Sequence, residues 1–216
     1  MIRIAIDGPG GAGKSTIAKA VARELGIDYI DTGAMYRAVG YKMKKEGISA
    51  DDEKSVGEML ERTEIDFSGG DTLLDGNIVN EEIRTPEIAS AASACAVLPA
   101  VRSKLVDLQR RMAQTKSVIM DGRDIGTNVL TDAEFKFYMT ASAEERAKRR
   151  FDELTAKGKN VRYEDVLNDI EERDRNDMNR ELNPLRKAED AVELDTTSMS
   201  ISEVTDRIIS EIRRGL

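Results

Sequence analysis

The segment GPGGAGKST limits the possible folds of this 216-residue chain more than any other stretch. It matches the pattern G-x-x-x-x-G-K-[ST], and it lies between a strand pattern at Ile2–Ile6 and a helix pattern from Lys14 to about Leu25. Glycines let backbone N–H groups turn inward around phosphate oxygens, and the start of the next helix adds positive potential. We therefore predict a nucleoside triphosphate site formed by Gly8, Pro9, Gly10, Gly11, Ala12, Gly13, Lys14, Ser15 and Thr16.

Two residues of this loop and one acid elsewhere in the chain have predictable roles. Lys14 is expected to reach the β- and γ-phosphate oxygens, and the Ser15 hydroxyl to ligate Mg²⁺. Asp121 follows the strand pattern 117–120 and suits a Walker-B-like carboxylate that acts on Mg²⁺ through water. Because Asp-Gly is also a turn pair, a purely structural role for Asp121 is the alternative.

Strand and helix patterns alternate along most of the chain, which is the order of a parallel sheet with helical crossovers. Strand patterns that suit this sheet occur at 2–6, 29–30, 117–122, 134–140 and 191–196. The alternation breaks at 65–82, where Asp75-Gly76 separates two apolar runs and predicts a hairpin. We expect a single α/β domain over 1–216, a three-layer P-loop NTPase fold with a five-stranded parallel sheet and a small antiparallel insertion.

Composition excludes several classes of function. The net charge of −8 leaves no overall basic field for nucleic acid or anionic membranes. No apolar run approaches the roughly 18 residues that a membrane span needs. The first residues show no signal-peptide pattern, and the lone Cys95 suits a reducing compartment as a buried, inert thiol. A cytoplasmic protein is expected.

Three classes of protein use such a phosphate loop. The N-K-x-D motif of a GTPase switch is absent, and FSGGD at 67–71 resembles the L-S-G-G-Q signature of transporter motors only superficially, because it falls in the predicted hairpin. A small-molecule kinase needs a second anion site rich in arginine. Arginines that suit such a site occur in four segments of the chain: Arg37, Arg102, Arg123, Arg173 and Arg180.

The absence of histidine bears on the acceptor. An alcohol acceptor needs a base to take its proton, whereas a phosphate monoester is mostly dianionic at pH 7 because its second pKa is about 6. An arginine-rich site without histidine therefore favours a phosphate acceptor. Asp31 remains a possible base for an alcohol, so that alternative stays open.

Five segments carry a family resemblance, namely GPGGAGKST, DTGAMYR, EEIRTPEIASAAS, DGRDIGT and ERDRND. In this order and spacing, the chain resembles bacterial cytidylate kinases over essentially its whole length. The resemblance implies transfer of the γ-phosphoryl group of ATP·Mg²⁺ to CMP or dCMP. It also implies a monophosphate-binding insertion at about 63–95 and a lid at about 146–162. Another acceptor, such as UMP or shikimate, and a non-catalytic nucleotide switch are the alternatives.

The resemblance also implies a role for individual residues. The CMP phosphate would contact Thr32, Tyr36, Arg37 and Arg123. The cytosine would be read by Ser93, Arg102 and Asp124, and the ribose by Arg173 and Asp177. Arg180 would span the phosphates. The transfer step is assigned to Lys14, Arg123, Arg173 and Arg180, and Mg²⁺ to Ser15 and Asp121.

Helical spacing adds two expectations about the second half of the chain. Arg173, Asp177 and Arg180 are spaced to share one face of a helix that points into the site, so Arg180→Met is expected to leave folding nearly intact. In the lid, one of Arg146, Arg149 and Arg150 is expected to reach the ATP phosphates on closure, without a preference among them. Nothing in the sequence marks an interface, so a monomer is expected.

Overall fold

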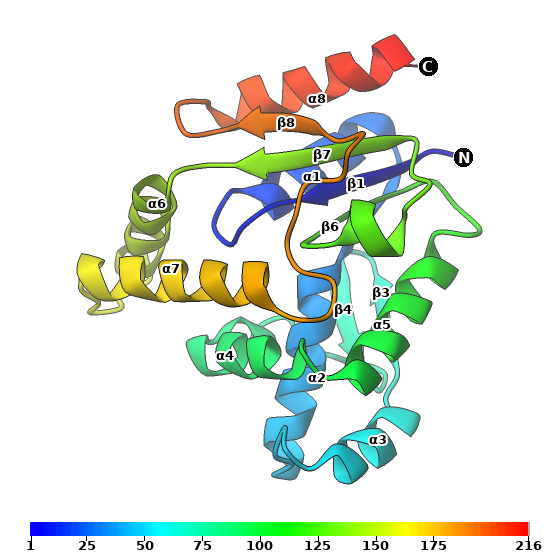
Figure 1. Cartoon of the computed structure of the whole chain (residues 1–216), viewed down its shortest axis with the longest axis vertical. Helices are drawn as coiled ribbons and strands as arrows, with labels where there is room; N and C mark the ends of the chain where they lie inside the picture. Colours follow the sequence, from blue (N-terminus) through cyan, green and yellow to red (C-terminus); the bar gives the residue numbers. More distant parts are fainter. Residues whose placement is uncertain (216) are drawn as a thin grey trace. The chain divides into compact units, whose positions relative to one another are not determined.

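The computed structural model describes residues 1–215, which form two compact units. The first unit contains Met1–Tyr29 and the chain from Lys116 onward, and the second contains Ile30–Thr115. Figure 1 shows their elements coloured along the sequence. The phosphate loop lies in the first unit, and the predicted insertion lies in the second.

The first unit is built on a parallel sheet. Its strands follow the order β2-β6-β1-β7-β8, with β1 paired in parallel to both β6 and β7, and β7 paired to β8. The strands are β2 (Asp28–Asp31, of which the last two residues are counted with the second unit), β6 (Val118–Gly122), β1 (Arg3–Asp7), β7 (Phe135–Thr140) and β8 (Val192–Asp195). The helical segments are α1 (Lys14–Leu25), a π-helical turn η2 (Ile125–Val129), α6 (Ala143–Ala156), α7 (Tyr163–Asn179) and α8 (Ile201–Gly215). The predicted five-stranded parallel sheet is confirmed.

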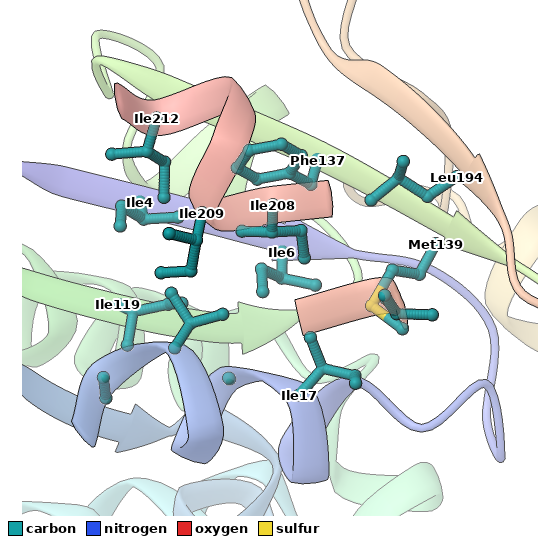
Figure 2. Close-up of a cluster of buried hydrophobic side chains, with 14 of the residues drawn as sticks. Ile4, Ile6, Ile17, Ile119, Phe137, Met139, Leu194, Ile208, Ile209 and Ile212 are labelled. Carbon is teal, nitrogen blue, oxygen red and sulfur yellow. The ribbon is translucent and has the colours of Figure 1, made fainter. Parts of the chain in front are cut away.

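A buried apolar cluster holds α1 and α8 against this sheet (Figure 2). Side chains four residues apart lie on one face of a helix, and each of these helices presents such a row to the strands. The cluster includes Ile17 and Val21 of α1, Ile208 and Ile212 of α8, and Ile4, Ile6, Phe137 and Met139 of the strands. This packing fixes the start of α1 relative to the carboxyl end of β1, where the phosphate loop lies.

The second unit combines helices with a small antiparallel sheet. Its elements are α2 (Thr32–Glu46), α3 (Glu53–Glu61), β3 (Ile65–Ser68), β4 (Asp71–Leu74), β5 (Asn77–Ile78), η1 (Glu82–Arg84), α4 (Pro86–Cys95) and α5 (Pro99–Met112). Strands β3, β4 and β5 form an antiparallel meander, as predicted. Asp75 and Gly76 both have positive φ, 50° and 78°, which is the conformation of a tight hairpin turn between β4 and β5.

The small residues of α4 serve helix packing. A Cβ at Gly40 of α2 would lie 2.9 Å from the Ala92 backbone nitrogen, so only glycine lets the two helices approach this closely. Cys95 is buried in the same helix, and burial raises the pKa of its thiol to about 12. The inert thiol expected from the sequence agrees with this placement. Within residues 1–215, no helix is both long and apolar enough to cross a membrane.

Candidate active site

The phosphate loop joins β1 to α1 through three glycines with positive φ. The φ values are 148° at Gly8, 78° at Gly11 and 88° at Gly13, and Gly13 caps the start of α1. L-amino acids with a side chain rarely adopt these conformations, which explains the glycines of the motif. The loop therefore ends at the positive end of a 12-residue helix, a favourable position for phosphate.

Lys14 is buried at the base of this loop. Its Nζ donates a hydrogen bond to the Pro9 carbonyl oxygen at 2.7 Å, which places the ammonium inside the curve of the loop. Burial, assisted by the positive charge of Arg123, lowers the pKa of Lys14 to about 7. A bound polyphosphate would supply the negative charge that this buried ammonium needs.

Ser15 and Asp121 bring two oxygen ligands together. The Ser15 hydroxyl donates to Asp121 Oδ2 at 2.9 Å, and the Tyr29 hydroxyl donates to Asp121 Oδ1 at 2.7 Å. Hydroxyl and carboxylate oxygens are the ligands that Mg²⁺ prefers, and Mg²⁺ commonly takes one or two carboxylates together with substrate phosphates. The pair therefore fits a magnesium ion beside the phosphate loop. Sequence reasoning missed Tyr29, which orients the carboxylate.

Arg123 and Arg173 lie beside Gly10, and Asp177 pairs with Arg123. Arg123 Nε donates to Asp177 Oδ2 at 2.6 Å. A Cβ at Gly10 would lie 3.5 Å from Arg123 Nη2 and 3.6 Å from Arg173 Cδ, so both arginines lie against the loop. Although burial raises the pKa of Asp177, the charge of Arg123 and its hydrogen bond lower it below the ordinary value. Two cations and one carboxylate are thus concentrated beside the predicted phosphate position.

Arg180 and Asp124 form a second buried ion pair. Arg180 Nη2 lies 2.8 Å from Asp124 Oδ1, and the two side chains are only 7% and 8% exposed. Arg180 Nε also donates to the Asn183 carbonyl oxygen at 2.6 Å. Arg180 is the C-cap of α7, which ends at Asn179: its backbone N–H still donates to the Asn176 carbonyl oxygen at 3.1 Å, and its ψ of 141° ends the helix. The expectation that Arg180 shares a helical face with Arg173 and Asp177 stays a prediction.

In the second unit, Tyr36 and Arg102 come together. Arg102 Nη1 lies 3.4 Å from the Tyr36 hydroxyl and 3.4 Å from the Ala96 carbonyl oxygen. Thr32 is buried at the first position of α2, and Ser93 is half-buried on α4. The predicted CMP contacts of these residues stay predictions.

Arg37 is a cation of this unit that suits an incoming anion. Its Nη2 lies 3.1 Å from Asp31 Oδ2, while its buried Nε has no hydrogen-bond partner among residues 1–215. Asp31 caps α2 by accepting a hydrogen bond from the Ala34 backbone N–H at 2.8 Å. Asp31 therefore has a structural role, and Arg37 keeps a donor available for a ligand.

The three lid arginines have different surroundings. Arg149 pairs with Glu145 and donates to the Thr196 carbonyl oxygen, and Arg150 forms a surface pair with Glu153. Arg146 is buried and contacts the phosphate loop itself, at the Gly10 carbonyl oxygen. The predicted lid at 146–162 spans the rest of α6 from Arg146 and the connection to α7, and its closure stays a prediction.

Asp7 is a further residue that sequence reasoning missed. Its carboxylate accepts hydrogen bonds from the backbone N–H groups of Ile125 and Gly126 at 2.8 and 2.7 Å. Burial raises the pKa of Asp7 to about 6, although these two hydrogen bonds oppose the shift. Asp7 thereby fixes η2, the turn that follows Arg123 and Asp124. The only sequence signal for a role of Asp7 was its position at the end of β1.

Comparison with known proteins identifies close relatives. A family model described as cytidylate kinase matches residues 4–214. The cytidylate kinase of Clostridioides difficile is 51% identical over 209 residues, which cover 97% of this chain and 97% of that protein. The cytidylate kinase of Caldicellulosiruptor bescii is 53% identical over 212 residues, which cover 96% of this chain and 94% of that protein.

Solved structures share the fold at much lower identity. The crystal structure of shikimate kinase from Bacteroides thetaiotaomicron matches 98% of this chain and 98% of its own, with a TM-score of 0.50 and 13% identity. That likeness concerns the fold alone. The family model and the relatives at 51% and 53% identity span nearly the whole chain, and this chain therefore belongs to the cytidylate kinase family of P-loop nucleoside monophosphate kinases.

Proposed function

We propose that this protein transfers the γ-phosphoryl group of ATP to CMP or dCMP, giving ADP and CDP or dCDP. The full-length match to the cytidylate kinase family carries the proposal. The transfer is a direct in-line displacement, since the site offers positive charge and no histidine for base catalysis. We propose that the protein works as a monomer in the cytoplasm.

The first unit supplies the groups that ATP needs. The loop Gly8–Thr16 would bind the β- and γ-phosphates, with Lys14 protonated against them. Ser15 and Asp121 would hold Mg²⁺, which neutralises phosphate charge when bound. Arg123 and Arg173 lie against the same loop at Gly10 and would stabilise charge in transfer.

The acceptor is held by charge rather than by a base. In the second unit, Arg37 would bind the CMP phosphate through its unsatisfied Nε–H, and Thr32 and Tyr36 would add hydroxyl contacts. Ser93 and Arg102 would contact cytosine. Residues of the first unit have further proposed roles. Arg123 would also contact the CMP phosphate, and Asp124 would contact the cytosine. Asp177 and Arg173 would contact the ribose, and Arg180 would contact the phosphates.

ADP release with different sole acceptors tests this proposal. The assay compares CMP, dCMP, UMP, AMP and shikimate with ATP·Mg²⁺ at one protein concentration. Rapid turnover with CMP and dCMP and much slower turnover with UMP is expected. Turnover with shikimate instead would indicate an alcohol kinase. ATP binding without turnover on any acceptor would indicate a nucleotide switch.

Asp31→Asn and Arg37→Met separate the two kinase classes. The amide introduced by Asp31→Asn retains an oxygen that can cap α2, so this variant is expected to lower kcat/KM for CMP by less than about tenfold. Arg37→Met removes a cation from the acceptor phosphate and is expected to lower kcat/KM by about 10²-fold or more. Steady-state kinetics on both variants measures the difference. The reverse order of effects would point to Asp31 as a base.

ATP binding should take up a proton above neutral pH. Lys14 has a pKa of about 7 in the free protein, so it is mostly neutral at pH 8. Phosphates around it favour the ammonium and raise the pKa of Lys14, so net proton uptake on ATP binding is expected at pH 8. By linkage, Kd for ATP rises with pH above 7.

Calorimetry in two buffers of different ionisation enthalpy measures this uptake. The matched control is Lys14→Arg, which stays charged at every pH tested and is expected to show no uptake. Equal binding enthalpies in the two buffers with the unsubstituted protein would contradict the assigned titration of Lys14.

A further inference from the structure

The buried guanidinium of Arg146 joins three parts of the first unit. Nε donates to the Ala141 carbonyl oxygen at 2.9 Å, and Nη1 donates to the Gly10 carbonyl oxygen of the phosphate loop at 3.0 Å. Nη1 and Nη2 also donate to the two carboxylate oxygens of Asp174, at 3.1 and 2.6 Å. The side chains of Arg146 and Asp174 are 5% and 15% exposed. Figure 1 shows α6 and α7, which carry them, lying next to each other.

This geometry suits a side chain that fixes the conformation of the phosphate loop. A guanidinium that bonds both oxygens of a carboxylate has a fixed orientation, which a single contact does not provide. The Arg146 side chain also packs against the next loop residue, Gly11, because a Cβ at Gly11 would lie 3.2 Å from Arg146 Cβ. Two successive residues of the phosphate loop are therefore supported from outside by Arg146.

Asp174 relates the contacts of Arg146 to those of Arg173, its neighbour in sequence, which also lies against Gly10. It follows Arg173 directly on α7, and Arg173 Cδ would lie 3.6 Å from a Cβ at Gly10. Arg146 therefore binds the Gly10 carbonyl while Arg173 lies against the position of its missing side chain. Arg146 thus connects Asp174 of α7 directly to the loop.

We propose that Arg146 and Asp174 are positioning residues that hold the Gly10 carbonyl and thereby set the curvature of the loop for the ATP phosphates. This rests on the proposed function. The alternative is that Arg146 itself binds a phosphate. All three of its guanidinium nitrogens already donate to protein oxygens, which favours the positioning role.

Asp174→Asn distinguishes the two roles. A lost charge-assisted hydrogen bond typically changes affinity by about tenfold. If the pair positions the loop, Asp174→Asn, Arg146→Met and the double variant should each raise Kd for ADP by about tenfold, without additivity. Kd for CMP should stay within about twofold. If Arg146 binds phosphate directly, Asp174→Asn releases it and leaves ADP binding unchanged or tighter, which would overturn the proposal.

Calorimetry on the whole protein gives these constants without turnover, so the result does not depend on which acceptor is used. The control Arg175→Met removes an exposed cation that pairs with Glu171 at 4.0 Å, and it should change neither Kd. An unsubstituted protein that binds ADP but does not phosphorylate CMP would contradict the proposed function alone. An unsubstituted protein that fails to bind ADP would overturn the positioning role.

If the single variants are too unstable for binding measurements, a double variant with two apolar residues tests the same proposal. Arg146→Met with Asp174→Leu removes both buried charges and should restore the melting temperature. If the pair only stabilises the fold, this variant binds ADP normally, which would overturn the proposal. If the pair positions the loop, Kd for ADP stays raised by about tenfold despite restored stability.

Discussion

Gly8→Ala is expected to abolish the folded phosphate site, and it should have the largest effect on stability of any single change in the loop. The Cβ of an alanine would overlap the Met139 carbonyl oxygen of β7 and would lie 3.1 Å from the carbonyl carbon. Gly8 also has φ 148°, which side chains disfavour. Because β7 is an interior strand of the sheet, neither backbone can move away without breaking ladder hydrogen bonds. We expect a loss of more than about 4 kcal/mol in the free energy of unfolding.

Gly26→Ala is the matched control in the same unit. Gly26 caps the end of α1 with φ 64°, but a Cβ added there would have no heavy atom of the described residues within 4 Å apart from its chain neighbours. Only left-handed strain remains, so a loss of about 1–2 kcal/mol with retained ATP binding is expected. Urea unfolding and ADP calorimetry measure both variants. Similar losses of unfolding free energy in the two variants would show that the overlap with the Met139 carbonyl oxygen does not determine the cost of Gly8→Ala.

The elements of the fold were predictable because their signals are local. The start of α1 at Lys14 follows directly from the glycine loop, and its predicted end at about Leu25 is where the structure ends it, with Gly26 as the left-handed cap. Asp75-Gly76 predicted the turn between β4 and β5 for the same reason, since both residues need positive φ. The turn η2 was not predicted, because its conformation depends on Asp7, which is distant in sequence.

The pairing of charges in the site was less predictable. The sequence indicated Arg123, Asp124, Asp177 and Arg180 as ligand contacts, but it contained no sign that they pair as Arg123–Asp177 and Asp124–Arg180. Helical periodicity placed Arg180 on the face of Arg173 and Asp177. It did not indicate that the helix ends at Asn179, nor that Arg180, its C-cap, bonds Asp124 and the Asn183 carbonyl oxygen. Such an end is set by tertiary contacts that periodicity does not contain.

Arg180→Met is expected to lower kcat by about 10²-fold or more, because the substitution removes a cation that would stabilise transition-state charge. It should also destabilise the protein, contrary to the expectation from sequence that folding stays nearly intact. The Asp124 side chain is only 8% exposed and would lose the Arg180 guanidinium, which lies 2.8 Å from its Oδ1. Removing one member of a buried ion pair typically costs about 3–5 kcal/mol. Steady-state kinetics measures the change in kcat, and urea unfolding measures the change in stability.

Asp124→Asn combined with Arg180→Met separates catalysis from stability. The double variant leaves no buried charge at this pair, so much of the lost stability should return. At saturating CMP, kcat should remain low because the cation is still missing, whereas loss of the proposed Asp124 contact with cytosine should raise KM for CMP. If turnover instead returned along with stability, Arg180 would act on the reaction only through the fold. Unchanged turnover in the single variant would exclude Arg180 from the transfer step altogether. Either result would leave Lys14, Arg123 and Arg173 as the cations available for the transferred phosphoryl group.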